Sequence, residues 1–301
     1  MHRLPFASPA RFLAVLLAGC ATAAAVHCQA ASPSAPNPAV PDAAAPQSAQ
    51  GQPAAETNNE LLAKAARLYY STDKAGLAGF DCAVHPDWHA LFVSDGNGAV
   101  DAADPRIVLL NSVSIAFHAR LKGGSGLDWN LPAHPAQPLD QESTSLLDKM
   151  QAGTAQTLQG FMQFWTPFVD GSIVPDSSDG VEITPTDKGG YKLRAEQEGT
   201  TLTEVLDKSL VLQQFNVVMN GMTVNFFPSY KPTEKGLLVT SFVAHIMPAG
   251  ATAEQANEMH VNIEYQTVDG FPIPAKLNLE ELNHGIFNFV LDGCTVTRQA
   301  R

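Results

Sequence analysis

The chain has 301 residues and a formal net charge of −12, with 18 Lys and Arg residues against 30 Asp and Glu residues. Because it contains no run of Lys or Arg, this acidic composition argues against nucleic-acid binding and against electrostatic attachment to anionic lipid headgroups. Any contact with lipid must therefore be apolar.

The first thirty residues have the layout of a secretory signal peptide. Arg3 and Arg11 supply positive charge, the apolar stretch Phe12–Gly19 follows, and small residues come next. This stretch is too short to span a bilayer, which takes about 20 residues. We therefore predict that residues 1–30 direct export, which implies a periplasmic location.

Leu17-Ala18-Gly19-Cys20 resembles a bacterial lipobox, in which the chain is cut before the Cys and the Cys receives acyl chains. Such chains at Cys20 would tether the protein to the outer membrane. The alternative is ordinary cleavage after a small residue, for example Ala30. That cut would leave Cys82 and Cys294 as an even pair, whereas cleavage before Cys20 leaves an odd thiol in the tail.

Residues 31–57 are almost entirely Ala, Pro, Ser, Gln and Asn. Such a segment lacks the large apolar side chains that could offset the entropy of ordering a chain, so it should be a disordered tether. Residues 58–301 have the size of one domain.

Two segments of this domain have a helical pattern. Asn58 to Tyr70 carries apolar residues at three- and four-residue spacing, which predicts a short helix. A longer helix is predicted for about 139–164, and Pro167 should end it. Its apolar stripe includes Leu147, Met150, Leu158, Phe161 and Trp165. This stripe suits an ordinary core helix, and it suits equally a lid over a ligand cavity.

Most of the remaining domain has strand patterns separated by turn signals such as Asn220-Gly221. The strand region begins at 77–84, and Val113–Leu121 alternates apolar and polar residues. Further strands are predicted at 181–184, 191–197, 201–206, 210–219, 222–227, 237–247, 259–268, 273–282 and 285–297. The fold class is therefore α+β, mainly antiparallel β, with about ten strands curved around the inserted amphipathic helix.

The strands 237–247 and 259–268 suggest a specific register. Pairing Phe242 with Ile263 places the apolar residues of both strands on one face, and it places His245 beside His260 on the other. These two histidines could form a metal pair, but they lack an obvious third ligand.

A rigid corner follows the strand that ends at Val268. Gly270 permits a backbone angle that other residues avoid, and Pro272 and Pro274 fix φ where the strand changes direction. Because proline also withholds a donor from the sheet ladder, the corner should lie at an edge or rim.

Residues 236–295, which contain this corner, resemble the ending of the periplasmic lipoprotein-carrier superfamily, the LolA/LolB-like and RseB-like proteins. The resemblance rests on a strand that ends in Tyr265, the corner from Val268 to Pro274, and the two strands that follow. It implies an unclosed β-barrel with a helical lid over a cavity for an acyl chain, a lipoprotein or another hydrophobic ligand. No binding residue of the family can be carried over position by position, so the candidate lining residues are taken from the apolar stripe and strands of this chain: Leu147, Met150, Leu158, Phe161, Trp165, Phe242, Ile263 and Tyr265.

Cys82 and Cys294 lie in the first and last predicted strands. In an exported protein this pair predicts a structural disulfide, although the pair is not part of the family's pattern.

Residue types that carry chemistry do not assemble into a catalytic or metal pattern. His85 and His89 flank Pro86 and lack the Glu of a zinc helix, and Asp95–Asp101 begins like a calcium loop but loses its ligands. Ser125, between two glycines, lacks the α/β context of a nucleophile elbow. We therefore predict a non-enzymatic binding protein without cofactor or metal. The alternative is an envelope structural or interaction module with a filled core.

Overall fold

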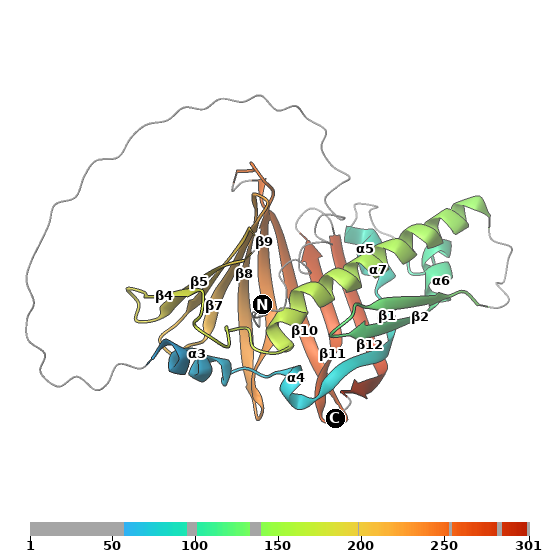
Figure 1. Ribbon diagram of the computed structural model, residues 1–301. Coiled ribbons are helices and arrows are strands. Elements are labelled where there is room, and N and C mark those ends of the chain that lie inside the picture. Colours follow the sequence, from blue (N-terminus) through green and yellow to red (C-terminus); the bar gives the residue numbers. More distant parts are fainter. Residues whose placement is uncertain are drawn as a thin grey trace, which may run out of the picture.

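The computed structural model describes residues 57–94, 101–132, 140–197, 199–252, 255–281 and 285–299. The predicted signal peptide with Cys20, nearly all of the tether and most of the Asp95–Asp101 loop lie outside these residues. Figure 1 shows one curved sheet with a long helix lying across one face. Among the described residues, no helix is both long and apolar enough to cross a bilayer.

The sheet has twelve strands, and every neighbouring pair is antiparallel. The strands are β1 (Leu77–Pro86), β2 (Ser114–Arg120), β3 (Gly126–Asn130), β4 (Val181–Pro185), β5 (Tyr191–Gln197), β6 (Thr200–Leu206), β7 (Leu212–Met219), β8 (Met222–Thr233), β9 (Gly236–Met247), β10 (Asn257–Val268), β11 (Phe271–Glu281) and β12 (Gly285–Arg298).

Their spatial order is β3-β2-β1-β12-β11-β10-β9-β8-β7-β6-β5-β4, so the two edges are β3 and β4 and the sheet is not closed into a barrel. The chain forms two antiparallel meanders, and the first strand β1 joins them by pairing with the last strand β12. The predicted fold class is thus confirmed as mainly antiparallel β. About ten strands were expected, and the sheet has twelve: eleven correspond to the predicted segments, and β3, in which three of five residues are Gly, Asp or Asn, was missed.

The helices are α3 (Asn58–Ala66), α4 (Thr72–Ala75), α5 (Trp88–Ser94), α6 (Pro105–Asn111) and α7 (Gln141–Val169). Thr57 and Glu60 form a capping box that starts α3. The side chain of Asp140 caps α7 by accepting from the backbone N–H of Ser143 at 2.8 Å. Helices α5 and α6 were not predicted, because each has only seven residues.

Two helix ends differ from the sequence prediction. Helix α3 ends at Ala66, and Tyr69, which was expected to be helical, pairs with Leu237 of β9 instead. Helix α7 runs through Pro167 to Val169. A proline in the last turn removes few helical hydrogen bonds, and the burial of Phe168 and Val169 favours continuing the helix past it.

The register of β9 and β10 also differs. Phe242 lies opposite Val261, not Ile263, and His245 lies opposite Glu258, not His260. The shift is two residues, which keeps every side chain on its expected face because side chains alternate with a period of two.

The corner after β10 is a two-residue turn, Asp269-Gly270, with φ of 50° and 83°. Pro272 and Pro274 follow it inside β11, where they pair with Thr267 and Tyr265 of β10. The register of β11 with β12 runs only from Lys276 to Glu281, so the prolines lie where β11 has one paired neighbour. The predicted change of direction is therefore made by the turn, and the prolines lie near the rim.

Candidate functional site

Helix α7 covers an apolar face of the sheet, here called the inner face. Phe164 and Phe168 of α7 contact Phe226 of β8 and Phe242 of β9. The ring centroids lie 5.4 Å apart for Phe164 and Phe226, and 5.6 Å apart for the stacked pair Phe168 and Phe242. Side chains of the helix and the sheet therefore touch directly along this part of the inner face.

The structure brings the eight predicted lining residues into one hydrophobic cluster. Leu147, Leu158, Phe161, Trp165, Phe242 and Ile263 are buried, and Met150 and Tyr265 are partly buried against the same cluster. The apolar stripe of α7 thus faces the sheet, as its spacing predicts. Whether these residues line a ligand stays a prediction.

One hydrogen-bond chain joins α7 to the middle of the sheet. The indole Nε1–H of Trp165 donates to Tyr265 Oη of β10 at 2.8 Å, and Tyr265 Oη donates to the carbonyl oxygen of Val239 of β9 at 2.7 Å. Burial raises the pKa of Tyr265, so its hydroxyl stays protonated. The contacts of Phe164 and Phe168 with the inner face, by contrast, are apolar.

Two tyrosines that follow α3 are fixed against β9. Tyr70 N–H donates to the carbonyl oxygen of Leu237 at 2.9 Å, and Leu237 N–H donates to the carbonyl oxygen of Leu68. The chains approach so closely that a Cβ at Gly236 would lie 2.7 Å from backbone atoms of Tyr69 and Tyr70. Both tyrosine side chains are therefore held in the interior.

Burial isolates the hydroxyl of Tyr70, which finds no hydrogen-bond partner among the described residues. The loss of water raises its pKa to about 12. Tyr69 differs, because its Oη accepts from Leu212 N–H at 2.6 Å and donates to the carbonyl oxygen of Leu210.

A buried carboxyl group on β6 escaped the sequence analysis. Glu204 is only 4% exposed, and it shares the inward side of β6 with Leu202 and Leu206. Its Oε2 has no hydrogen-bond partner among the described residues, and burial raises its pKa to about 8. The strand alternation contained the signal, since Glu204 occupies a position where an apolar residue is expected.

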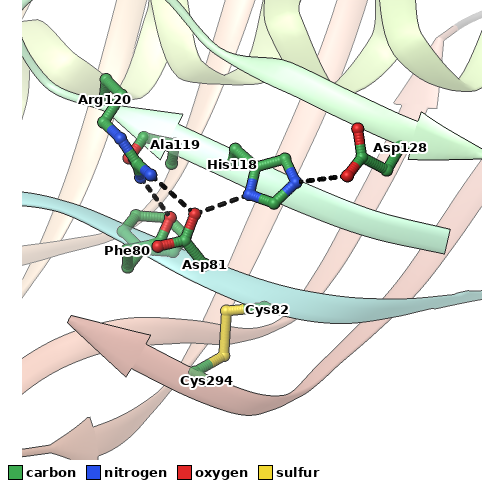
Figure 2. Close-up of polar contacts among 8 residues, drawn as sticks. All are labelled: Phe80, Asp81, Cys82, His118, Ala119, Arg120, Asp128 and Cys294. Atoms are coloured by element: carbon green, nitrogen blue, oxygen red, sulfur yellow. Dashed lines mark hydrogen bonds and ion pairs between the residues drawn. A yellow bond between two sulfur atoms is a disulfide. The ribbon is translucent and has the colours of Figure 1, made fainter. Parts of the chain in front are cut away.

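The opposite, outer face carries a charged cluster at β1, β2 and β3, which Figure 2 shows. His118 Nδ1 lies 2.6 Å from Asp81 Oδ1, and its Nε2 lies 3.0 Å from Asp128 Oδ2. Arg120 also contacts Asp81, at 2.8 Å. Hydrogen bonds to Asp81 and Asp128 raise the pKa of His118. A histidine held as a cation between two carboxylates has no free nitrogen to act as a base, so the cluster is best explained as a clamp between strands.

A second outer-face cluster replaces the predicted histidine pair. Glu258 bridges both rings, with Oε2 2.9 Å from His245 Nε2 and Oε1 2.6 Å from His260 Nε2. The hydrogen bond from His260, followed by the charges of both histidines, lowers the pKa of Glu258. In the part of the chain that the structure describes, no group of three His, Cys, Asp or Glu residues could hold a metal ion.

His85 and His89 lie on different elements. His85 belongs to β1 and contacts Asp292 of β12 at 3.2 Å, whereas His89 lies in α5. Asp87 caps α5 by accepting from Ala90 N–H. The two histidines are therefore not on one helix face, which agrees with their rejection as a zinc pair.

The predicted disulfide between Cys82 and Cys294 is confirmed. It joins β1 to β12 across an irregularity in their register, beside the charged cluster of Figure 2. The bridge therefore fastens the two meanders to each other.

A hollow of about 240 Å³ lies near the start of β1, and its lining includes Leu77, Arg120, Lys122 and Gln299. Its two cationic side chains are already paired, Arg120 with Asp81 and Lys122 with Asp73. None of the predicted lining residues belongs to this hollow, which makes it a poor candidate for the acyl-chain site.

Comparison of the chain with protein-family models, with curated proteins and with solved structures found no match. The resemblance of residues 236–295 to the lipoprotein-carrier superfamily accordingly stays a prediction.

Proposed function

We propose that this protein is an exported, non-enzymatic binding protein that holds an acyl chain, a lipoprotein or another hydrophobic ligand between its curved sheet and helix α7. In this proposal Cys20 carries the acyl anchor at the outer membrane. The observation that carries it is the apolar inner face of an open sheet, covered by one long helix through contacts that are largely non-directional.

Non-directional contacts suit a lid, because an acyl chain can replace the side chains of α7 against the same apolar surface. Burying one Phe side chain stabilises the closed arrangement by about 1.5–3 kcal/mol, and each buried CH₂ group of an acyl chain contributes about 0.8 kcal/mol, so about two to four CH₂ groups match one Phe side chain. In the arrangement described here α7 is closed on the sheet.

The test is to extract protein purified from its host with organic solvent and to identify acyl lipid by mass analysis. Uptake of a neutral fluorescent acyl probe should accompany this result. Val261→Thr places a hydroxyl on the inner face with little change of shape, and Val290→Thr makes the same change at a position that is 43% exposed on the outer face. Because Val261 is 1% exposed in the closed arrangement, its new hydroxyl is buried with or without the probe, so we expect only the first variant to lose stability, by about 1–3 kcal/mol, and added probe should not restore that loss.

A second function, the envelope interaction module, is favoured by the direct aromatic contacts of Phe164 and Phe168 with Phe226 and Phe242. These contacts fill that part of the interior. Lipid-free protein that takes up no acyl probe would support this function and contradict the first.

A further inference from the structure

The inner face continues beyond the C-terminal end of α7 to a buried polar group on β6. Glu204 lies opposite Leu193 of β5 and Phe215 of β7, so apolar residues flank it on both neighbouring strands. It is 4% exposed, and its Oε2 has no hydrogen-bond partner among the described residues. A buried carboxyl oxygen without a partner is costly, and such a group often marks a place where a ligand binds.

A second buried polar atom without a partner lies on β8, two strands away from β6 in the sheet. The hydroxyl of Tyr230 is buried and finds no partner in the described part of the chain. The ring of Tyr230 packs edge-on against Tyr69, with centroids 5.4 Å apart. Glu204 is close enough that its charge raises the pKa of both tyrosines, in addition to the effect of burial.

The charges around Glu204 and Tyr230 favour a cation over an anion. Burial raises the pKa of Glu204, and no Lys or Arg among the described residues lowers it. An anionic headgroup would find no positive partner among those residues. A protonated amine would find a carboxylate and a hydroxyl oxygen that accepts.

Resting on the function proposed above, we propose that Glu204 and Tyr230 form a headgroup subsite for an amphiphile that carries a protonated primary amine at the end of an apolar chain. The chain lies on the inner face under α7. The ammonium donates to Glu204 and to Tyr230 Oη beside the ring of Tyr69. The ligand thereby supplies the partners that both buried groups lack.

Such a subsite has a distinctive pH dependence. The free protein holds Glu204 protonated below a pKa of about 8, whereas the bound ammonium requires the carboxylate. Binding at neutral pH therefore releases a proton, and affinity for the amine should rise by about tenfold per pH unit until that pKa is passed. The titratable groups coupled to this subsite are Tyr69, Tyr230 and Asp207. The charge of Glu204 raises the pKa of both tyrosines, and the charge of Asp207 also raises the pKa of Tyr69.

The experiment compares three probes of equal chain length, dodecylamine, dodecanol and dodecanoic acid, by displacement of a neutral fluorescent acyl probe between pH 6 and pH 9. Full-length protein is compared with Glu204→Gln and with the control Glu182→Gln, which makes the same change at an exposed position on β4. We expect dodecylamine to bind at least about tenfold more tightly than dodecanol at pH 8, and this preference and its pH dependence should disappear in E204Q alone.

Three results separate the possible failures. If dodecanol binds but dodecylamine binds no better, or if E204Q keeps the amine preference, the subsite is wrong and the proposed function stands. If none of the three probes binds, the proposed function fails and the subsite fails with it. Should E204Q not fold, Tyr230→Phe removes the second group, and an amine preference unchanged in that variant would overturn the proposal.

Discussion

The Trp165–Tyr265 hydrogen bond offers the sharpest test of how α7 is held on the sheet. Tyr265→Phe removes one hydroxyl and leaves the ring in place. The variant loses two hydrogen bonds, from Trp165 Nε1 at 2.8 Å and to the carbonyl oxygen of Val239 at 2.7 Å. Because Trp165 is 0% exposed, its indole N–H is left buried without a partner.

The expected loss of stability follows from these two bonds. An ordinary hydrogen bond contributes about 1 kcal/mol, and stranding a buried donor costs about 1–3 kcal/mol. We therefore expect the free energy of unfolding to fall by about 2–4 kcal/mol in Tyr265→Phe. If the bond holds α7 as a lid, the helix should also open more often, and amide exchange in α7 should be faster by about 30-fold or more, since each 1.4 kcal/mol corresponds to about a factor of ten.

Urea unfolding followed by circular dichroism measures the first quantity, and hydrogen exchange read by mass spectrometry measures the second. Tyr191→Phe, at a half-buried position on β5, is the matched control and should change stability by less than about 0.5 kcal/mol. A loss in Tyr265→Phe as small as that of the control would refute the reasoning. Equal acceleration of exchange in α7 and in β9–β11 would show that the bond supports the whole sheet and does not act on a separate lid.

Further expectations concern the disulfide, the outer-face clamp and the anchor. Replacing Cys82 and Cys294 by Ser should lower the free energy of unfolding by up to about 5 kcal/mol, because the bridge closes a long loop in the unfolded chain; wild-type protein that loses no stability on reduction would contradict this. Asp81 and Asp128 raise the pKa of His118 above its ordinary value of 6.5, so the clamp's contribution is fully present below that value and is lost as pH rises through the raised pKa. His118→Gln should accordingly cost more stability in mildly acidic than in alkaline urea titrations, and an equal cost at both would argue against the clamp. Cys20→Ala should move the protein from membrane to soluble fractions on cell fractionation, and an unchanged distribution would exclude lipidation.

Local patterns in the sequence identify most strands because a half-buried antiparallel strand alternates apolar and polar residues. In β2, Ile115, Phe117 and Ala119 are buried as the alternation predicts. Asn220-Gly221 is a two-residue turn with positive φ at both positions, as that dipeptide indicates. The helices α5 and α6 were missed because seven residues form only about two helical turns, which give few repeats of the 3.6-residue period. The strand β3 was missed because three of its five residues are Gly126, Asp128 and Asn130, types that are uncommon in strands.

The register of β9 and β10 shows what such patterns leave open. A shift of two residues moves Phe242 from Ile263 to Val261 yet leaves both on the inner face. The alternation of apolar and polar residues therefore fits both registers equally well. The connection from Pro248 to Ala256 is too long to be a tight turn, so turn geometry does not choose between them either.

The candidate site likewise has one part that the sequence predicts and one part that it does not. The stripe of α7 and the inward residues of β9 and β10 follow from spacing alone, so their common cluster was predictable. The full burial of Glu204 was not, because Leu193 of β5 and Phe215 of β7 flank it only in the assembled sheet.

For this protein the sequence by itself determined the longer elements, the inward face of the predicted strands and the mainly antiparallel class, because all three depend on side-chain period and on turn residues near in the chain. The sequence also predicted the Cys82–Cys294 bridge, but the tertiary structure alone decided that β1 pairs with β12 and that the buried Oε2 of Glu204 has no partner among the described residues. These features depend on contacts between distant segments, whose pairing is selected by the packing of the whole inner face and not by any local periodicity.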